Sequence, residues 1–174
     1  MWVKWMGAFL ILGAAAQWGS SQASKLRQRV KQLEEFRLAL RLLAAEVGYT
    51  ATPLPRALAQ IGTHLDTVGV RSFFTSVCNR LRESTNSDAA SAWLAAATDV
   101  QGELSLTAKD WAVIARAAAG LGGLGRDDQI KQLVAAETQL AAHATDAIAL
   151  CASGEKMWQY LGILSGVALV ILLL

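Results

Sequence analysis

The sequence predicts an all-α protein, an antiparallel bundle of about six helices flanked by an N-terminal and a C-terminal transmembrane helix. Of the 174 residues, 53% are hydrophobic and only 2 are prolines, and alanine and leucine are abundant; this composition favours helix. Apolar residues recur at helical spacing, and no segment alternates as a half-buried strand does. Because both ends are long apolar runs, we expect a span at residues 1–19, a helical domain at 20–156 and a span at 157–174.

The first apolar run extends from Trp2 to Trp18. At about 1.5 Å per residue it measures about 26 Å, close to the ~30 Å hydrocarbon core of a bilayer. The alternative is a cleaved signal peptide, with Lys4 as its basic start and Ser21-Gln22-Ala23 as its cleavage site. The basic residues from Lys25 to Lys31 favour a retained span, because positive charge on this flank opposes its translocation.

The C-terminal run, Met157 to Leu174, carries no charged side chain, and Lys156 precedes it. Basic residues therefore flank both runs on the side of the domain, so the positive-inside rule predicts a cytoplasmic domain with both termini outside. We expect a protein of the cell membrane that crosses it twice and contacts membrane lipid.

The first helix of the domain is expected from about Lys25 to Gly48, as a continuation of the first span. An apolar stripe at helical spacing forms its inner face. Its charged residues are expected on other faces: Arg27, Lys31, Glu34, Glu35 and Arg41.

Three shorter helices are expected next. The segment Thr-Pro-Leu-Pro breaks the chain, and Thr52 is expected to cap a second helix. A third helix is expected over Val70–Glu83. A fourth is opened by Ser87 and Asp88 and closed by Gly102.

A capping box marks the start of the fifth helix. Thr107 and Asp110 have its spacing, with Asp in place of the usual Glu. Leu106 and Trp111 occupy the positions of a hydrophobic staple around it. We therefore expect a helix to begin here and Trp111 to be buried.

The sixth helix is expected to be long and opened by Asp127 and Asp128, which the helix dipole favours at this end. We expect it to run through Ser153 and Gly154 into the second span. Its inner face is expected at Ile130, Leu133, Val134, Leu140, Ala144, Ile148 and Cys151.

The glycines from Gly120 to Gly125 formally match G-x-G-x-x-G. A dinucleotide site needs a strand before the glycines, whereas a helix is expected here, and Asp127 and Asp128 would place negative charge where the phosphates bind. We interpret the segment as a helix C-cap and turn. The sequence predicts no cofactor.

The chemistry-bearing residues do not form an active-site pattern. His64 and His143 have no neighbours at metal-ligand spacing, so no metal site is predicted. Cys78 and Cys151 lie in apolar helical stretches and are interpreted as small buried side chains. No nucleophile motif occurs, and a net charge of +2 is too small to indicate a nucleic-acid partner. The sequence therefore predicts no catalytic residue and no enzymatic activity.

Several segments carry a resemblance to a known family over nearly the whole chain. They are the start MWVKWMGAFLILGAAA, the stretch Leu40–Leu58 with its Thr-Pro-Leu-Pro core, Trp93, the stretch Leu106–Leu133 with its leucine–glycine turn and Asp-Asp-Gln helix start, and the end KMWQYLGILSGVALVILLL. In these segments the chain resembles the stage III sporulation protein AB family of endospore-forming bacteria. Two features depart from the family pattern: Arg56 stands where the family usually has Glu, and the turn after residue 119 has more glycines.

The resemblance implies a non-enzymatic component of the mother-cell complex that links mother cell and forespore, in the mother-cell membrane around the forespore. Its domain would be similar to that of type II secretion and type IV pilus inner-membrane platform proteins. It would connect a cytoplasmic secretion-type ATPase, the partner called stage III sporulation protein AA, to the membrane parts of the channel. The sequence leaves homo-oligomerisation open.

A platform must present one surface to its ATPase. We expect this surface at helix starts about one helix length from the two points where the domain joins the membrane spans, because a cytoplasmic ring approaches from that side. The candidate interface residues are Glu46, Arg56, Arg126, Asp127 and Gln129. The alternative function is an extracytoplasmic helical binding module with a cleaved leader and a C-terminal anchor, which an N-terminus near Ser24 would indicate.

Overall fold

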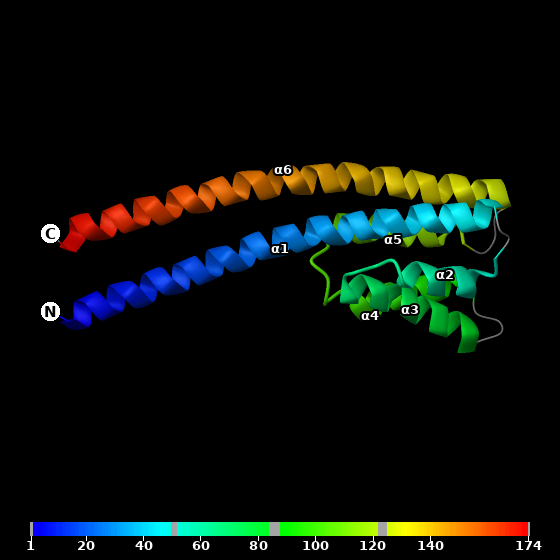
Figure 1. Ribbon diagram of the computed structural model, residues 1–174, viewed down its shortest axis with the longest axis horizontal. Helices are drawn as coiled ribbons and strands as arrows, with labels where there is room; N and C mark the ends of the chain where they lie inside the picture. Colours follow the sequence, from blue (N-terminus) through cyan, green and yellow to red (C-terminus); the bar gives the residue numbers. More distant parts are fainter. Residues whose placement is uncertain (1, 50–51, 84–87, 122–124, 174) are drawn as a thin grey trace. The chain divides into compact units, whose positions relative to one another are not determined.

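The computed structural model describes the backbone of residues 2–49, 52–83, 88–121 and 125–173, and the side chains of residues 24–49, 52–83, 88–121 and 125–154. Six helices and no strand occur in these ranges (Figure 1). The helices are α1 (Trp2–Tyr49), α2 (Leu54–Gly62), α3 (Val68–Glu83), α4 (Ala89–Val100), α5 (Ala108–Ala118) and α6 (Arg126–Leu173). The predicted all-α class is confirmed.

The chain divides into two compact units. Residues Arg29–Thr145 form the helical domain, and Met1–Gln28 together with Asp146–Leu174 form the other unit. Helices α1 and α6 are each continuous across the boundary, as predicted. The side chains of both expected spans, 1–19 and 157–174, lie outside the described residues. Within the part that is described, no helix is long and apolar enough to cross a membrane.

Inside the domain, α1 and α6 lie side by side and antiparallel (Figure 1). Arg37 of α1 donates a hydrogen bond to Glu137 of α6, with 3.1 Å between Nε and Oε1. A Cβ atom added to Gly48 would lie 3.5 Å from Cδ1 of Ile130. Since the partner of a later α1 residue is an earlier α6 residue, the two helices run in opposite directions.

The inner face of α6 differs in part from the expectation. Val134 and Ile148 are 49% and 51% exposed, so their assignment to the inner face was wrong. The buried positions are three or four residues apart, which is about one helical turn, so they lie on one face of α6. They are Leu133, Ala136, Leu140, Ala144 and Ala147.

Five aromatic rings form the centre of the domain core: Phe36 of α1, Phe73 and Phe74 of α3, Trp93 of α4 and Trp111 of α5. Phe73 and Trp93 meet edge to face with 4.9 Å between ring centroids, and Phe36 and Phe73 with 5.4 Å. Edge-to-face contacts at these distances stabilise aromatic pairs beyond the burial of their area. The predicted burial of Trp111 is confirmed, because only 7% of it is exposed.

Two of the predicted helix starts had different outcomes. The capping box is confirmed: the Thr107 hydroxyl accepts from the Asp110 amide, and the Thr107 amide donates to Asp110 Oδ2 over 2.8 Å. Thr52 is not the cap of α2, because the helix begins at Leu54 with Pro53 as its N-cap. A Thr52 hydroxyl would cap the amide of the residue two or three positions on, and the second of these, Pro55, has no N–H group.

The end of α5 also differs from the expectation. Its C-cap is Ala119, in right-handed helical geometry, and not one of the glycines. Gly120 lies close to α6, because a Cβ atom there would lie 3.0 Å from Cβ of Gln132. Glycine at this position favours the close approach of the turn after α5 to α6.

Candidate functional site

The predicted interface residues come from three helix ends within the domain. Glu46 lies in the last turn of α1, Arg56 in the first turn of α2, and Arg126, Asp127 and Gln129 in the first turn of α6. The end of α1 and the start of α6 are joined directly, because Arg126 hydrogen-bonds to backbone carbonyls of α1. Residues of all three ends line one hollow, so the three ends meet at one end of the domain.

A hollow of about 300 Å³ lies at this meeting point. We call it the end hollow. Its apolar lining comes from α1, α2 and the segment after α5, and its polar lining from Thr52 and the start of α6. The apolar lining residues are Val47, Leu54, Ala57 and Leu121, and the polar ones are Thr52, Arg126 and Gln129. Two of the five predicted interface residues, Arg126 and Gln129, thus line a hollow that sequence reasoning did not foresee.

Arg126, one of the lining residues of the end hollow, also has a structural role. The last four carbonyls of a helix have no partner within the helix, and α1 ends at Tyr49. Arg126 Nε donates to the carbonyl of Val47 over 2.6 Å, and its Nη2 donates to the carbonyl of Gly48. A cation at this end also interacts favourably with the helix dipole. Arg126 therefore ties the first turn of α6 to the last turn of α1.

Arg56 and Asp127 are exposed charges that are not among the residues lining the end hollow. Arg56 lies between the lining residues Leu54 and Ala57 in sequence, and Asp127 follows Arg126. Within the described residues, neither side chain makes a hydrogen bond or ion pair. Both are therefore exposed charges in the first turns of α2 and α6.

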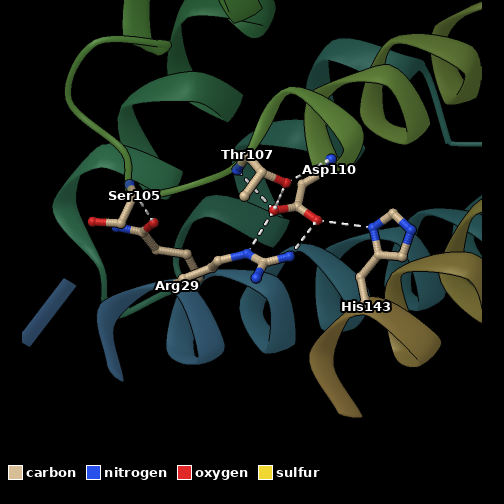
Figure 2. A network of polar contacts seen from close by, with 6 residues as sticks. Arg29, Ser105, Thr107, Asp110 and His143 are labelled. Atoms are coloured by element: carbon tan, nitrogen blue, oxygen red, sulfur yellow. Dashed lines mark hydrogen bonds and ion pairs between the residues drawn. The ribbon is translucent and has the colours of Figure 1, made fainter. Parts of the chain in front are cut away.

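A second polar cluster lies in the domain interior, around the carboxylate of Asp110 (Figure 2). Its side chain is completely buried. Arg29 of α1 donates to it through Nε over 2.8 Å and through Nη2 over 3.1 Å. His143 of α6 places Nδ1 2.8 Å from Asp110 Oδ1, and the Thr107 amide and hydroxyl each donate to Oδ2 over 2.8 Å. One carboxylate therefore joins α1, α5 and α6.

The surroundings of Asp110 keep it ionised. Burial by itself would raise its pKa, but the hydrogen bonds from Arg29 and Thr107 and the charge of Arg29 outweigh burial and lower the pKa to about 2. With both oxygens occupied by donors, the carboxylate has no lone pair directed at a ligand. The carboxylate therefore acts as an internal brace between the helices.

The described ranges contain no group of three or more His, Cys, Asp or Glu side chains that could hold a metal ion. Cys78 is buried, Cys151 is half-buried, and both are unbridged thiols. The glycines after α5 follow a helix and not a strand.

The family model described as Stage III sporulation protein AB matches residues 4–174. The chain belongs to the stage III sporulation protein AB family. It is 33% identical over 172 residues to the stage III sporulation protein AB of Bacillus subtilis (strain 168), a match that covers 99% of each chain. A solved structure of a stage III sporulation protein AB, 31% identical, matches with a TM-score of 0.66 over 70% of this chain and 94% of that chain.

Two further polar side chains of α1 organise the domain of this stage III sporulation protein AB family member. Gln32 Oε1 accepts from the amide of Ser105 over 2.8 Å. Glu35 accepts from the amide of Thr67 over 3.0 Å and from its hydroxyl over 2.7 Å, just before α3 begins. Glu35 was expected on a solvated face and is 9% exposed, so that assignment was wrong.

Sequence reasoning missed the cluster around Asp110. Asp110 was interpreted only as a helix cap, Arg29 only as part of a basic run, and His143 as a lone histidine. The partners of Asp110 lie 81 and 33 residues away in the chain. No local spacing connects such positions, so only the tertiary fold brings them together.

Proposed function

We propose that this chain is a non-enzymatic membrane platform component of a sporulation secretion-type channel complex between mother cell and forespore, and that it couples a cytoplasmic ATPase to the membrane assembly. Membership of the stage III sporulation protein AB family supports the sporulation role. The single observation that carries the platform role is the continuity of α1 and α6. Each is one helix that runs from the domain core into an apolar terminal run.

A coupling element must transmit force between its two ends, and the domain has the cross-links for this. Arg37 and Glu137 join α1 to α6 over 3.1 Å at mid-domain. The carboxylate of Asp110 joins Arg29 to His143 near the residues where both helices leave the domain. Arg126 joins the two helices at the other end. A displacement at the end hollow would therefore move both helices together.

The distance along the domain suits this role. From Arg29 to Val47 the helix α1 rises about 27 Å at about 1.5 Å per residue. The end hollow thus lies about that far from the point where α1 leaves the domain. We propose that this end receives the ATPase, with Glu46, Arg56, Arg126, Asp127 and Gln129 as candidate contacts.

The proposed topology has two spans, a cytoplasmic domain and both termini outside. The continuity of α1 favours a retained first span, because cleavage at Ser21-Gln22-Ala23 would cut a helix in its middle. The basic residues after the first run favour a cytoplasmic domain.

Reporter fusions test this topology. A reporter inserted within residues 84–87, between α3 and α4, should show cytoplasmic activity, and a C-terminal fusion should show extracytoplasmic activity. Mass spectrometry of the intact chain should show the full N-terminal sequence. An extracytoplasmic signal from the inserted reporter, or an N-terminus near Ser24, would instead indicate the anchored extracytoplasmic binding module.

A further inference from the structure

We infer that three buried polar side chains of α1 lock this helix axially against the starts of α3 and α5, so that α1 cannot slide along its axis on its own. The three side chains are Arg29, Gln32 and Glu35, which we call the polar ladder. The consequence for coupling rests on the proposed function: a displacement would pass through the domain as the movement of one rigid body, and not as a piston movement of α1.

The polar ladder is withdrawn from solvent. Gln32 is 4% exposed and Glu35 is 9% exposed, and the Arg29 side chain is 12% exposed. Residues three apart on a helix are neighbours on its surface. They are separated by about 4.5 Å along the axis, at about 1.5 Å per residue. Each member therefore meets the rest of the domain at a different level along α1.

Two members of the polar ladder hold backbone amides that precede helices. Glu35 accepts from the amide of Thr67 over 3.0 Å and from its hydroxyl over 2.7 Å, and Thr67 directly precedes α3. Gln32 Oε1 accepts from the amide of Ser105 over 2.8 Å, in the segment that leads into α5. Amides withdrawn from water need an acceptor, so both segments depend on the axial position of α1.

The third member reaches the first turn of α5 itself (Figure 2). Arg29 donates two hydrogen bonds to Asp110, and the same carboxylate accepts from the amide and the hydroxyl of the N-cap residue Thr107. A bidentate arginine–carboxylate pair fixes orientation as well as distance. The start of α5 is therefore tied to one position along α1.

Hydrogen bonds restrict axial sliding more than apolar contacts do. Packed helices slide past each other by about 1–2 Å in known conformational changes. A slide of this size along α1 would stretch and bend all the ladder contacts at once, and hydrogen bonds weaken steeply as their angle closes. The amides of Thr67 and Ser105 would then lose their acceptors.

The ion pairs between α1 and α6 do not restrict sliding in this way. Glu137 of α6 lies 3.1 Å from Nη2 of Arg37 and 3.7 Å from Nε of Arg41. The two arginines are about one helical turn apart on α1, so Glu137 keeps a cation within reach as α1 moves along its axis. These pairs hold the two helices side by side without fixing their axial position, and they provide a matched control.

The test measures the distance between two spin labels by double electron–electron resonance, on the full chain in lipid nanodiscs. The labels are attached at Ala45→Cys on α1 and Lys109→Cys on α5, two exposed positions, after both native cysteines have been replaced by serine. Lys109 is next to Asp110, the partner of Arg29, and the rise of α1 from Arg29 to Ala45 is about 24 Å. The labels are therefore separated mainly along α1, and axial sliding changes their distance directly.

The main variant removes the whole polar ladder. It also neutralises Asp110, because this carboxylate would otherwise stay buried without its arginine, and apolar replacement of a complete buried charged group often preserves folding. The ladder-free variant combines Arg29→Leu, Gln32→Leu, Glu35→Leu and Asp110→Asn. Glu35→Gln is the conservative variant, since it keeps an acceptor oxygen for the Thr67 amide. Glu137→Gln is the control, which weakens the ion pairs with α6 and leaves the ladder intact.

The ladder-free variant should broaden the distance distribution by about 2 Å, the range of helix sliding. The wild type, Glu35→Gln and Glu137→Gln should share one narrow distribution. Circular dichroism shows whether each variant is folded. If the ladder-free variant is unfolded, Gln32→Leu with Asp110→Asn, which keeps Glu35 in place, should broaden the distribution by about 1 Å. A width equal to that of the wild type in the folded ladder variant, or equal broadening in Glu137→Gln, would show that the ladder does not lock α1.

Addition of the purified secretion-type ATPase, with and without nucleotide, separates the axial lock from the proposed function. The label distance in the wild type should stay unchanged when the ATPase binds, because α1 moves together with the starts of α3 and α5. A shift of about 1–2 Å in the bound wild type would mean that α1 slides as a piston, so the lock is wrong while the platform role stands. If the ATPase does not bind, the platform role fails, and the distributions of the free chain still decide whether α1 is locked.

Discussion

Arg29 binds the buried carboxylate of Asp110 with two hydrogen bonds, Nε to Oδ2 over 2.8 Å and Nη2 to Oδ1 over 3.1 Å. The arginine side chain is 12% exposed and the aspartate side chain 0%. Such a bidentate pair fixes both distance and orientation. Because Arg29 lies on α1 and His143, the other neighbour of this carboxylate, lies on α6, the pair holds together the two helices that leave the domain.

The first prediction compares this buried pair with an exposed one. Asp110→Asn leaves Arg29 with an uncompensated buried charge and should lower the free energy of unfolding by about 3–5 kcal/mol. The matched control is Asp99→Asn, which breaks the Arg80–Asp99 pair, 2.6 Å long with side chains 40% and 49% exposed. That change should cost no more than about 1 kcal/mol. Urea unfolding of the full chain in detergent, followed by tryptophan fluorescence, measures both, and equal losses would contradict the proposed brace.

The second prediction concerns acid. Folding lowers the pKa of Asp110 from 3.8 to about 2. Its carboxylate therefore stabilises the fold fully above the pKa of the unfolded chain, and this contribution, on the order of 2 kcal/mol, is lost as pH falls through about 2. The wild-type chain should lose this amount more than Asp110→Asn between about pH 5 and pH 2. Parallel pH dependences of the two unfolding free energies would show that Asp110 is not the titrating group.

The third prediction separates two buried tryptophans. Trp93 Nε1 donates to the carbonyl of Ile114 over 2.9 Å, whereas Trp111 Nε1 has no hydrogen-bond partner in the described part of the chain. Trp93→Phe loses ring area and a hydrogen bond, but Trp111→Phe removes an unsatisfied donor along with the ring area. Trp93→Phe should therefore cost about 1 kcal/mol more. The urea unfolding midpoints of the two variants measure this difference. An equal or larger loss of stability in Trp111→Phe would contradict the prediction.

How far the sequence predicts this structure depends on the range of the interactions. The capping box at Thr107 and Asp110 needs only residues three positions apart, and the structure has it. Thr52 does not cap α2, because Pro55 has no N–H group that could donate to the Thr52 hydroxyl. The pairing of Arg29 with Asp110 spans 81 residues and leaves no local signal.

The candidate interface shows the same division. Capping signals in the sequence predict helix starts, so the first turn of α6 was placed correctly near Arg126. The sequence could not predict the end hollow, because the lining residues Val47, Ala57 and Leu121 come from distant parts of the chain. Its existence depends on how α1, α2 and the end of α5 pack.

The fourth prediction tests the tie between α6 and α1. Arg126→Ala removes both hydrogen bonds to the carbonyls of Val47 and Gly48. Because Arg126 is exposed, the loss of stability should be modest, about 1 kcal/mol. Amide hydrogen exchange should increase in the last turn of α1 but not around Asp110. An unchanged exchange pattern would show that Arg126 does not hold that turn.

The central claim is that this chain holds a cytoplasmic ATPase at the membrane. Flotation of proteoliposomes tests it most directly. The full chain is reconstituted into liposomes, the fraction with outward-facing domains is determined by protease digestion, and the purified secretion-type ATPase is added before flotation. The account predicts that the ATPase floats with these proteoliposomes, in proportion to the outward-facing domain, and stays at the bottom with empty liposomes. Recovery of the ATPase at the bottom in both cases would contradict the account.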